Sequence, residues 1–175
     1  METNNVILAN ILRAIGFLIA QVLVFKRIPL GFSKFNLVDI FIYPIFLMLL
    51  PVRTPHALAI LIGFLYGLAL DSFYGVIGIH AGTCVFIAFI RPFILALMEP
   101  KGGYNLNIGP TVSQLGLPWS MQYMAIMLVA HLFFYFSMEA FTFYYIIDIL
   151  KHTIVSFVVS FVFIVMYQFL LDPKV

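Results

Sequence analysis

The chain has 175 residues, of which 64% are hydrophobic and 9% charged, and its formal net charge is +2. Soluble domains are about half apolar and about a quarter charged, so this composition excludes an ordinary soluble domain and predicts an integral membrane protein. The Lys and Arg residues form no run longer than Lys26-Arg27, which argues against a nucleic-acid-binding surface. The single cysteine, Cys84, cannot form an intrachain disulfide and is expected to be a small core residue.

Apolar segments of about 20 residues, the length that crosses a hydrocarbon layer of about 30 Å, predict six transmembrane helices. The first, residues 6–25, ends at Lys26-Arg27, where charge followed by proline stops a helix. The second, residues 37–50, is short and contains Pro44, which predicts a tilt or a kink. The predicted fold class is therefore all-α, a polytopic membrane protein with one domain over residues 1–175.

Four further spans follow in chain order. Residues 56–71 and 76–97 are the third and fourth, and the few residues between them require an antiparallel hairpin. A polar stretch, residues 99–118, is expected in water or at the headgroups. The fifth and sixth spans are residues 119–140 and 145–171. Six spans put both termini on one side of the membrane, but the cationic residues divide evenly between the two sides and do not choose it.

The most informative segment carries one carboxylate and five glycines. Gly63, Gly67, Asp71 and Gly75 are spaced by four, so in one continuous helix they would share a face that another backbone could approach closely. An Asp at the centre of a membrane helix costs roughly 2.5 to 3.5 kcal/mol, and less near an interface, so we expect a packing or partner role for Asp71. The predicted signature or partner-binding residues are Gly63, Gly67, Asp71, Gly75, Gly78, His80 and Gly82.

Further polar residues are expected at the same membrane face, where the fifth span ends and the sixth begins. This possible rim consists of Glu139, Asp148, Lys151 and His152. Two interpretations stay open. Together with Asp71 and His80, these groups line a site for a partner or ligand, or they cap helix ends and pair along one helix at spacings of three and four.

Other polar residues inside the spans give weaker signals. His131, near the middle of the fifth span, has no Cys, Asp or second His at ligand spacing, so a neutral histidine bonded to a neighbouring helix is favoured over a metal ligand. Arg91 is expected to snorkel toward the membrane face. The chain carries no recognised catalytic motif, so neither enzymatic activity nor a metal or other cofactor is predicted.

These features together resemble the MreD family of rod shape-determining membrane proteins. The resemblance rests on Asn36-Leu-Val-Asp39, on the turn Leu50-Pro-x-Arg-x-Pro-His56, and on Gly-Phe-x-x-Gly-x-x-x-Asp followed by Gly-x-x-Gly-x-His-Ala in residues 63–81. It covers essentially the whole chain in length and span order. The second half matches mainly in hydropathy.

The resemblance implies a six-helix protein of the bacterial inner membrane with both termini in the cytoplasm. It implies a non-enzymatic scaffold that binds MreC and contacts membrane lipids, and that belongs with MreB, RodA and a penicillin-binding transpeptidase to the elongation complex supporting peptidoglycan synthesis and rod shape. The family fold is similar to the substrate-binding subunits of energy-coupling-factor transporters. The alternative is therefore a subunit that captures a small molecule in a cavity lined by Asp71, His80, Glu139, Asp148 and His152.

Overall fold

The computed structural model describes residues 2–27, 38–107 and 109–171, and this part of the chain is helical with no strand. Four of its helices are long and apolar enough to cross a membrane: α3 (His56–Tyr74), α4 (Ile79–Leu97), α6 (Leu117–Ala140) and α7 (Ile146–Leu171). These helices coincide with the predicted third to sixth spans to within a few residues. The all-α prediction is confirmed for the described residues.

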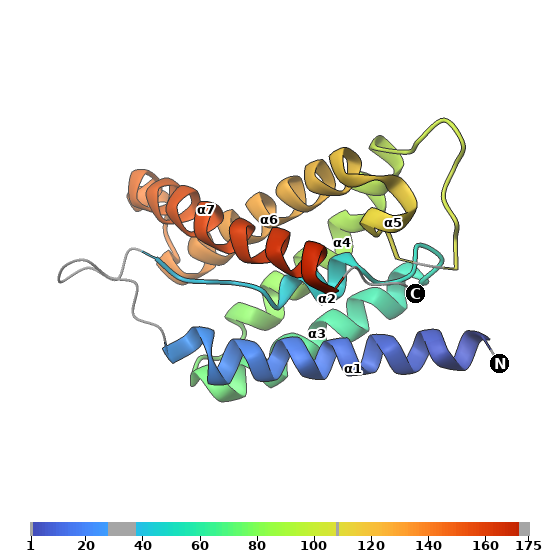
Figure 1. Ribbon diagram of the computed structural model, residues 1–175. Coiled ribbons are helices and arrows are strands. Elements are labelled where there is room, and N and C mark those ends of the chain that lie inside the picture. Colours follow the sequence, from blue (N-terminus) through green and yellow to red (C-terminus); the bar gives the residue numbers. More distant parts are fainter. Residues whose placement is uncertain (1, 28–37, 108, 172–175) are drawn as a thin grey trace.

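The predicted first span corresponds to α1 (Glu2–Leu23), which is followed by the 3₁₀ turn η1 (Phe25–Arg27) and is not one of the four candidate spans. The short elements are α2 (Pro44–Met48), α5 (Val112–Leu115) and the 3₁₀ turn η2 (Phe143–Tyr145). The start of α1 and the end of α7 lie at one end of the molecule, here called the first end (Figure 1). The α3–α4 and α6–α7 turns lie at the opposite, second end. A total of six spans is not confirmed.

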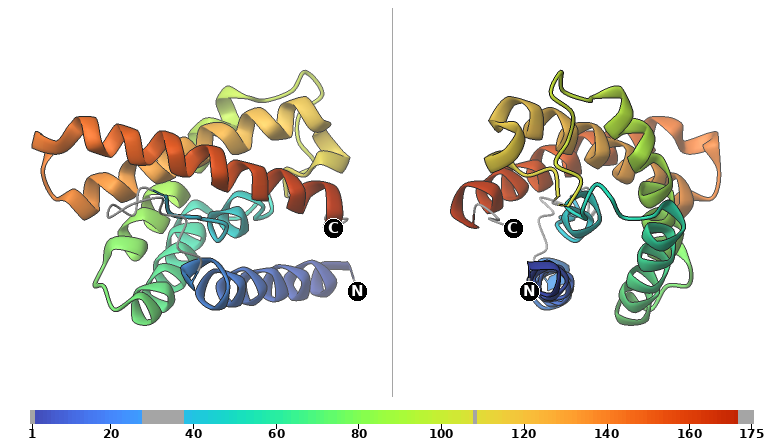
Figure 2. Two further views of the ribbon diagram at one scale, coloured as in Figure 1. Left: turned by 60° about the vertical axis from the view of Figure 1, so that its left-hand side comes forward. Right: turned by 90° about the vertical axis from the view of Figure 1, so that its right-hand side faces the viewer.

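The centre of the molecule is occupied by residues 38–50 rather than by a long helix. The most extensive helix contacts are between α3 and α4, and α6 packs against both α4 and α7. Residues 38–50 run between the α1 and α3 side and the α6 and α7 side (Figure 2). Every side chain from Ile40 to Leu50 is buried. This segment is therefore the part of the core that all the long helices surround.

The prediction of a single helix over residues 37–50 is wrong. Residue 37 lies outside the described residues, residues 38–42 are not helical, and only Pro44–Met48 forms α2. Pro44 stands in the first turn of α2, where its fixed φ suits a helix and its missing N–H has no partner to lose. The proline therefore marks the start of a short helix and not a kink within a long one.

The extended backbone before α2 finds hydrogen-bond partners on α7. Backbone polar groups at membrane depth need protein partners because no water is available there. The Asp39 N–H donates to Ser156 Oγ at 3.1 Å. The Phe41 N–H donates to Ser160 Oγ at 2.9 Å. Residues four apart on a helix are about 6 Å apart along its axis, and residues two apart on an extended chain are about 6.6 Å apart, so the two spacings match.

Gln21 of α1 bonds to the other edge of the same extended segment. Its Oε1 accepts the N–H of Ile42 at 3.0 Å, and its Nε2 donates to the carbonyl of Ile40 at 2.8 Å. The same Nε2 donates to Tyr74 Oη at 2.9 Å, which links the pair to the end of α3. Gln21 is buried. The segment thus joins α1 to α7 through side-chain bonds to its backbone.

Arg91 of α4 lies against the C-terminal end of α2 and is buried. Its Nη2 donates to the carbonyl of Leu50, and the carbonyl oxygens of Met48 and Pro51 lie 3.5 Å from its Nε and Nη2. The last carbonyls of a helix lack partners within the helix and carry partial negative charge, which explains why the guanidinium turns inward. The expectation that Arg91 snorkels toward the membrane face is wrong.

Part of the polar stretch 99–118 packs onto the first end of the molecule instead of extending into water. A β-carbon at Gly109 would stand 3.0 Å from the carbonyl carbon of Leu49, so only glycine fits this approach. The Arg53 N–H donates to the carbonyl of Leu106 at 2.8 Å. Residues 109–111 are buried, whereas residues 101–103 and 105–107 are exposed. The expected exposure therefore holds for only part of this stretch.

Candidate functional site

The predicted signature forms the α3–α4 turn at the second end. Gly75 ends α3 with φ 70°, and Gly78 precedes α4 with φ 86°. These left-handed conformations suit glycine, which has no β-carbon to clash. Because α3 ends before Gly75, this residue does not lie on the helix face that Gly63 and Gly67 share. The two glycines instead reverse the chain and aim the start of α4 at the end of α3.

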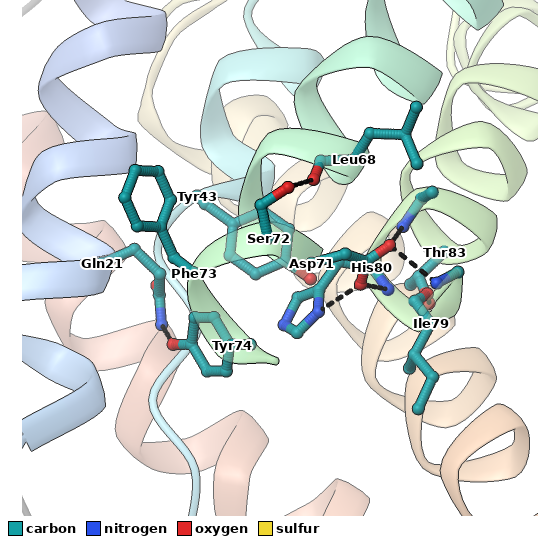
Figure 3. A network of polar contacts seen from close by, with 12 residues as sticks. Gln21, Tyr43, Leu68, Asp71, Ser72, Phe73, Tyr74, Ile79, His80 and Thr83 are labelled. Carbon is teal, nitrogen blue, oxygen red and sulfur yellow. Dashed lines mark hydrogen bonds and ion pairs between the residues drawn. The ribbon is translucent and has the colours of Figure 1, made fainter. Parts of the chain in front are cut away.

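The carboxylate of Asp71, in the last turn of α3, caps the first turn of α4 (Figure 3). Its Oδ2 accepts the N–H groups of Gly78 and Ala81 at 3.0 and 3.1 Å. Its Oδ1 accepts the N–H of His80 at 2.9 Å. The first N–H groups of a helix have no partner within it and form the positive end of its dipole. Hydrogen bonds to a charged group contribute about 1.5 to 3 kcal/mol each, so three of them offset the cost of burying this carboxylate.

His80 provides the fourth contact of Asp71. Its Nδ1 lies 2.9 Å from Asp71 Oδ1, and because a carboxylate only accepts, Nδ1 carries the proton in this bond. The ring is surrounded by Tyr74, Tyr135 and Tyr43, with centroid distances of 4.5, 5.2 and 5.7 Å. The Nε2 atom is buried and has no hydrogen-bond partner among the described residues. The histidine is thus held in one orientation inside the core.

Gly63 and Gly67 allow α3 and α4 to pack backbone against backbone. A β-carbon at Gly67 would stand 2.7 Å from both Ala81 N and His80 O. One at Gly63 would stand 2.9 Å from the carbonyl oxygen of Cys84. The sequence-based expectation of a closely approached glycine face is met at these two positions, with α4 as the neighbour. Gly82 differs, since a β-carbon there would meet only Met138 Cε at 3.7 Å, an ordinary contact.

The possible rim does not share the surroundings of Asp71 and His80. Glu139, Asp148 and Lys151 are exposed, whereas Asp71 and His80 are buried. Lys151 Nζ lies 3.4 Å from Asp148 Oδ1, with both side chains largely exposed, and such surface pairs contribute little to stability. The ring of His152 is partly buried and lies 5.4 Å from that of Phe136. The Asp148–Lys151 contact is the pairing along one helix that the second interpretation expects.

His131 is buried in α6, and its Nε2 lies 2.8 Å from Tyr43 Oη. Its Nδ1 is buried without a hydrogen-bond partner in the described part of the chain. Sequence reasoning expected a bond to a neighbouring helix, and the partner is instead the residue that precedes α2. The same reasoning did not single out Tyr43 or Gln21. A signal for Gln21 exists in the sequence, since it is an uncharged polar residue inside an apolar span.

Asp71 and its partners form a closed structural corner, and the described part of the chain has four candidate membrane-spanning helices and no strand. Among the described residues, no group of three His, Cys, Asp or Glu side chains is placed to hold a metal ion. No family model matches the chain, and comparison with curated proteins and with solved structures found no match. The MreD resemblance therefore depends on the sequence motifs alone.

Proposed function

We propose that this chain is a non-enzymatic membrane scaffold of the MreD type that binds MreC. The observation that carries the proposal is the use of Asp71, whose two carboxylate oxygens accept four hydrogen bonds from within one hairpin. A carboxylate used in this way builds a fixed shape and has little capacity left for chemistry on a substrate. The backbone contact of α3 with α4 at Gly63 and Gly67 supports the same interpretation, because it rigidifies the hairpin further.

The proposed membrane topology has six crossings. α1 has 22 residues, which correspond to about 33 Å and are sufficient for a membrane layer of about 30 Å. Residues 38–50 run from the second end toward the first as an extended segment and a short helix (Figure 1). Counted with the four candidate spans, these two segments give six, as in the substrate-binding subunits of energy-coupling-factor transporters. The membrane would be the bacterial inner membrane, with both termini in the cytoplasm.

In this proposal the hairpin shapes a surface on which the single span of MreC docks, and MreC links the chain to RodA, a penicillin-binding transpeptidase and MreB. Because Asp71 is 4% exposed, it positions neighbouring residues and does not itself touch the partner. The complex would support peptidoglycan synthesis and rod shape, in contact with membrane lipids. The role of Asp71 is thus to maintain the docking surface.

The test is co-purification of MreC with the tagged chain after co-expression, followed by microscopy of cell shape. Asp71→Asn is expected to reduce the amount of MreC recovered and to round the cells. Asp148→Asn is the matched control, since Asp148 is an exposed carboxylate, and it should leave both unchanged. Recovery of MreC and rod shape at wild-type levels with Asp71→Asn would refute the proposal.

The alternative, a small-molecule-capturing subunit, is favoured by a different observation. His80 Nε2, His131 Nδ1 and Tyr66 Oη are buried polar atoms without hydrogen-bond partners among the described residues, and a polar ligand could supply them. It is less well supported because Asp71, its principal anchor, is already fully engaged. Equilibrium binding of the purified protein to a panel of vitamins and lipid precursors tests it. Saturable binding that His80→Phe abolishes would establish this alternative over the scaffold.

A further inference from the structure

Both turns at the second end present large side chains that are mostly exposed. Ile77, between the two left-handed glycines, is 97% exposed. Phe141 and Tyr144, in the α6–α7 turn, are 89% and 86% exposed. Phe141 also has φ 50°, and no other non-glycine residue in the described ranges has a positive φ. A β-carbon disfavours this backbone conformation, so the left-handed conformation of Phe141 is energetically unfavourable while its ring is exposed.

The depth of both turns follows from one contact at the first end. Trp119 Nε1 donates to the carbonyl of Met98 at 2.7 Å, so the start of α6 and the end of α4 share one level, and an indole favours the membrane interface. From that level α4 covers about 30 Å back to Gly78, and α6 covers about 32 Å to Ala140, at 1.5 Å per residue. The hydrocarbon layer is about 30 Å thick. Both turns therefore reach the headgroup layer on the opposite side.

We propose that Ile77, Phe141 and Tyr144 anchor the second end in the lipid headgroup layer. At that depth the side chains of Ile77 and Phe141 are removed from water. Tyr144 keeps its hydroxyl hydrated while its ring contacts lipid. The left-handed Phe141 turns the chain over within a few residues and leaves its ring outside the helix pair. This anchoring does not depend on the proposed binding of MreC, since it requires only a bilayer.

Fluorescence quenching tests the proposal in vesicles of phosphatidylcholine that contain only this protein. Ile77→Cys and Phe141→Cys are each labelled with an environment-sensitive dye in a Cys84→Ala background. If that background lowers the yield, Cys84 is retained, because its thiol is buried. Val158→Cys is the control, since Val158 lies midway along α7 and is 56% exposed. The quenchers are a nitroxide on the lipid headgroup, a nitroxide deep on the acyl chain and a water-soluble cobalt complex.

The proposal predicts that both turn probes lose most of their emission to the headgroup nitroxide, whereas the Val158 probe responds to the acyl-chain nitroxide. Turn probes that respond to cobalt and not to the headgroup nitroxide would place the turns in water, available to a partner protein, and would overturn the proposal. Turn probes that respond to no quencher would show that a second copy of the chain covers them, which also overturns it.

Discussion

Asp71 and His80 contact each other twice: the carboxylate Oδ1 lies 2.9 Å from the ring Nδ1 of His80 and 2.9 Å from its backbone N. The last turn of α3 is thus tied to the first turn of α4 by both a side chain and the backbone. Because the same carboxylate also accepts the N–H groups of Gly78 and Ala81, the hairpin closes around one residue. Its substitution should affect the whole corner.

Asp71→Ala should be among the most destabilising single changes in this chain. It leaves three backbone N–H groups and the His80 ring without their acceptor in a buried place, and unsatisfied buried donors cost about 1 to 3 kcal/mol each. We expect the free energy of unfolding to fall by about 3 kcal/mol or more, measured by SDS titration in mixed micelles. Asp148→Ala should change it by less than about 0.5 kcal/mol. Equal effects of the two substitutions would contradict the capping role.

The two glycines Gly67 and Gly82 should respond oppositely to alanine. At Gly67 a β-carbon meets backbone atoms at 2.7 Å, so α3 and α4 must separate, and overpacking of this kind costs about 1 to 3 kcal/mol. At Gly82 there is room, and the higher helix propensity of alanine should leave stability unchanged or raise it by up to about 1 kcal/mol. Thermal unfolding in detergent measures both. A stable Gly67→Ala protein would mean that the helices do not pack this closely.

Ser160 should be needed for the extended segment rather than for its own helix. Ser160→Ala removes the acceptor of the Phe41 N–H, and we expect a loss of about 1 to 3 kcal/mol. Ser137→Ala is the control, because the Ser137 hydroxyl donates to Phe133 within the same helix, and its removal should have little effect. Hydrogen exchange of the Phe41 amide gives the direct readout, since it should accelerate only in Ser160→Ala.

Arg91 should stabilise the protein through its hydrogen-bonding shape as well as its charge. Arg91→Met removes the donors for the carbonyls at the end of α2, with an expected loss of about 3 kcal/mol. Arg91→Lys keeps the charge but not the planar fork, so it should recover only part of this. Arg53→Met, at an exposed position, should be nearly neutral. Full recovery in the lysine variant would show that charge alone matters.

The long helices could be predicted because about 20 apolar residues in a row give a strong signal. The predicted fifth span, residues 119–140, differs from α6 by two residues at its start, and the predicted sixth begins one residue before α7. The central segment could not be predicted in the same way. A buried extended chain and a buried helix are equally apolar, and hydropathy does not separate them. The partners that hold it extended, Gln21, Ser156 and Ser160, come from distant parts of the chain.

The segment that forms the Asp71 corner can be singled out in the sequence, but its internal arrangement cannot be derived from it. An isolated carboxylate among apolar residues marks Asp71, because such a residue is unfavourable without partners. Which groups bind it depends on the backbone angles of Gly75 and Gly78, which bring the start of α4 back to the carboxylate. Sequence spacing does not contain these angles. The same limit applies to the predicted rim, because sequence spacing does not show that Glu139 and Asp148 are exposed whereas Asp71 is buried.

The central claim, that Asp71 acts by holding the start of α4, is tested most directly by hydrogen exchange of the Gly78, His80 and Ala81 amides in nanodiscs. These N–H groups come first in the helix, so Asp71 is their acceptor in place of a helix carbonyl. With Asp71→Asn we expect exchange at these amides to be at least about tenfold faster, which corresponds to a fall of roughly 1.4 kcal/mol in the free energy of local opening. Exchange in α7 should not change. Wild-type exchange rates at all three amides would contradict this role of Asp71.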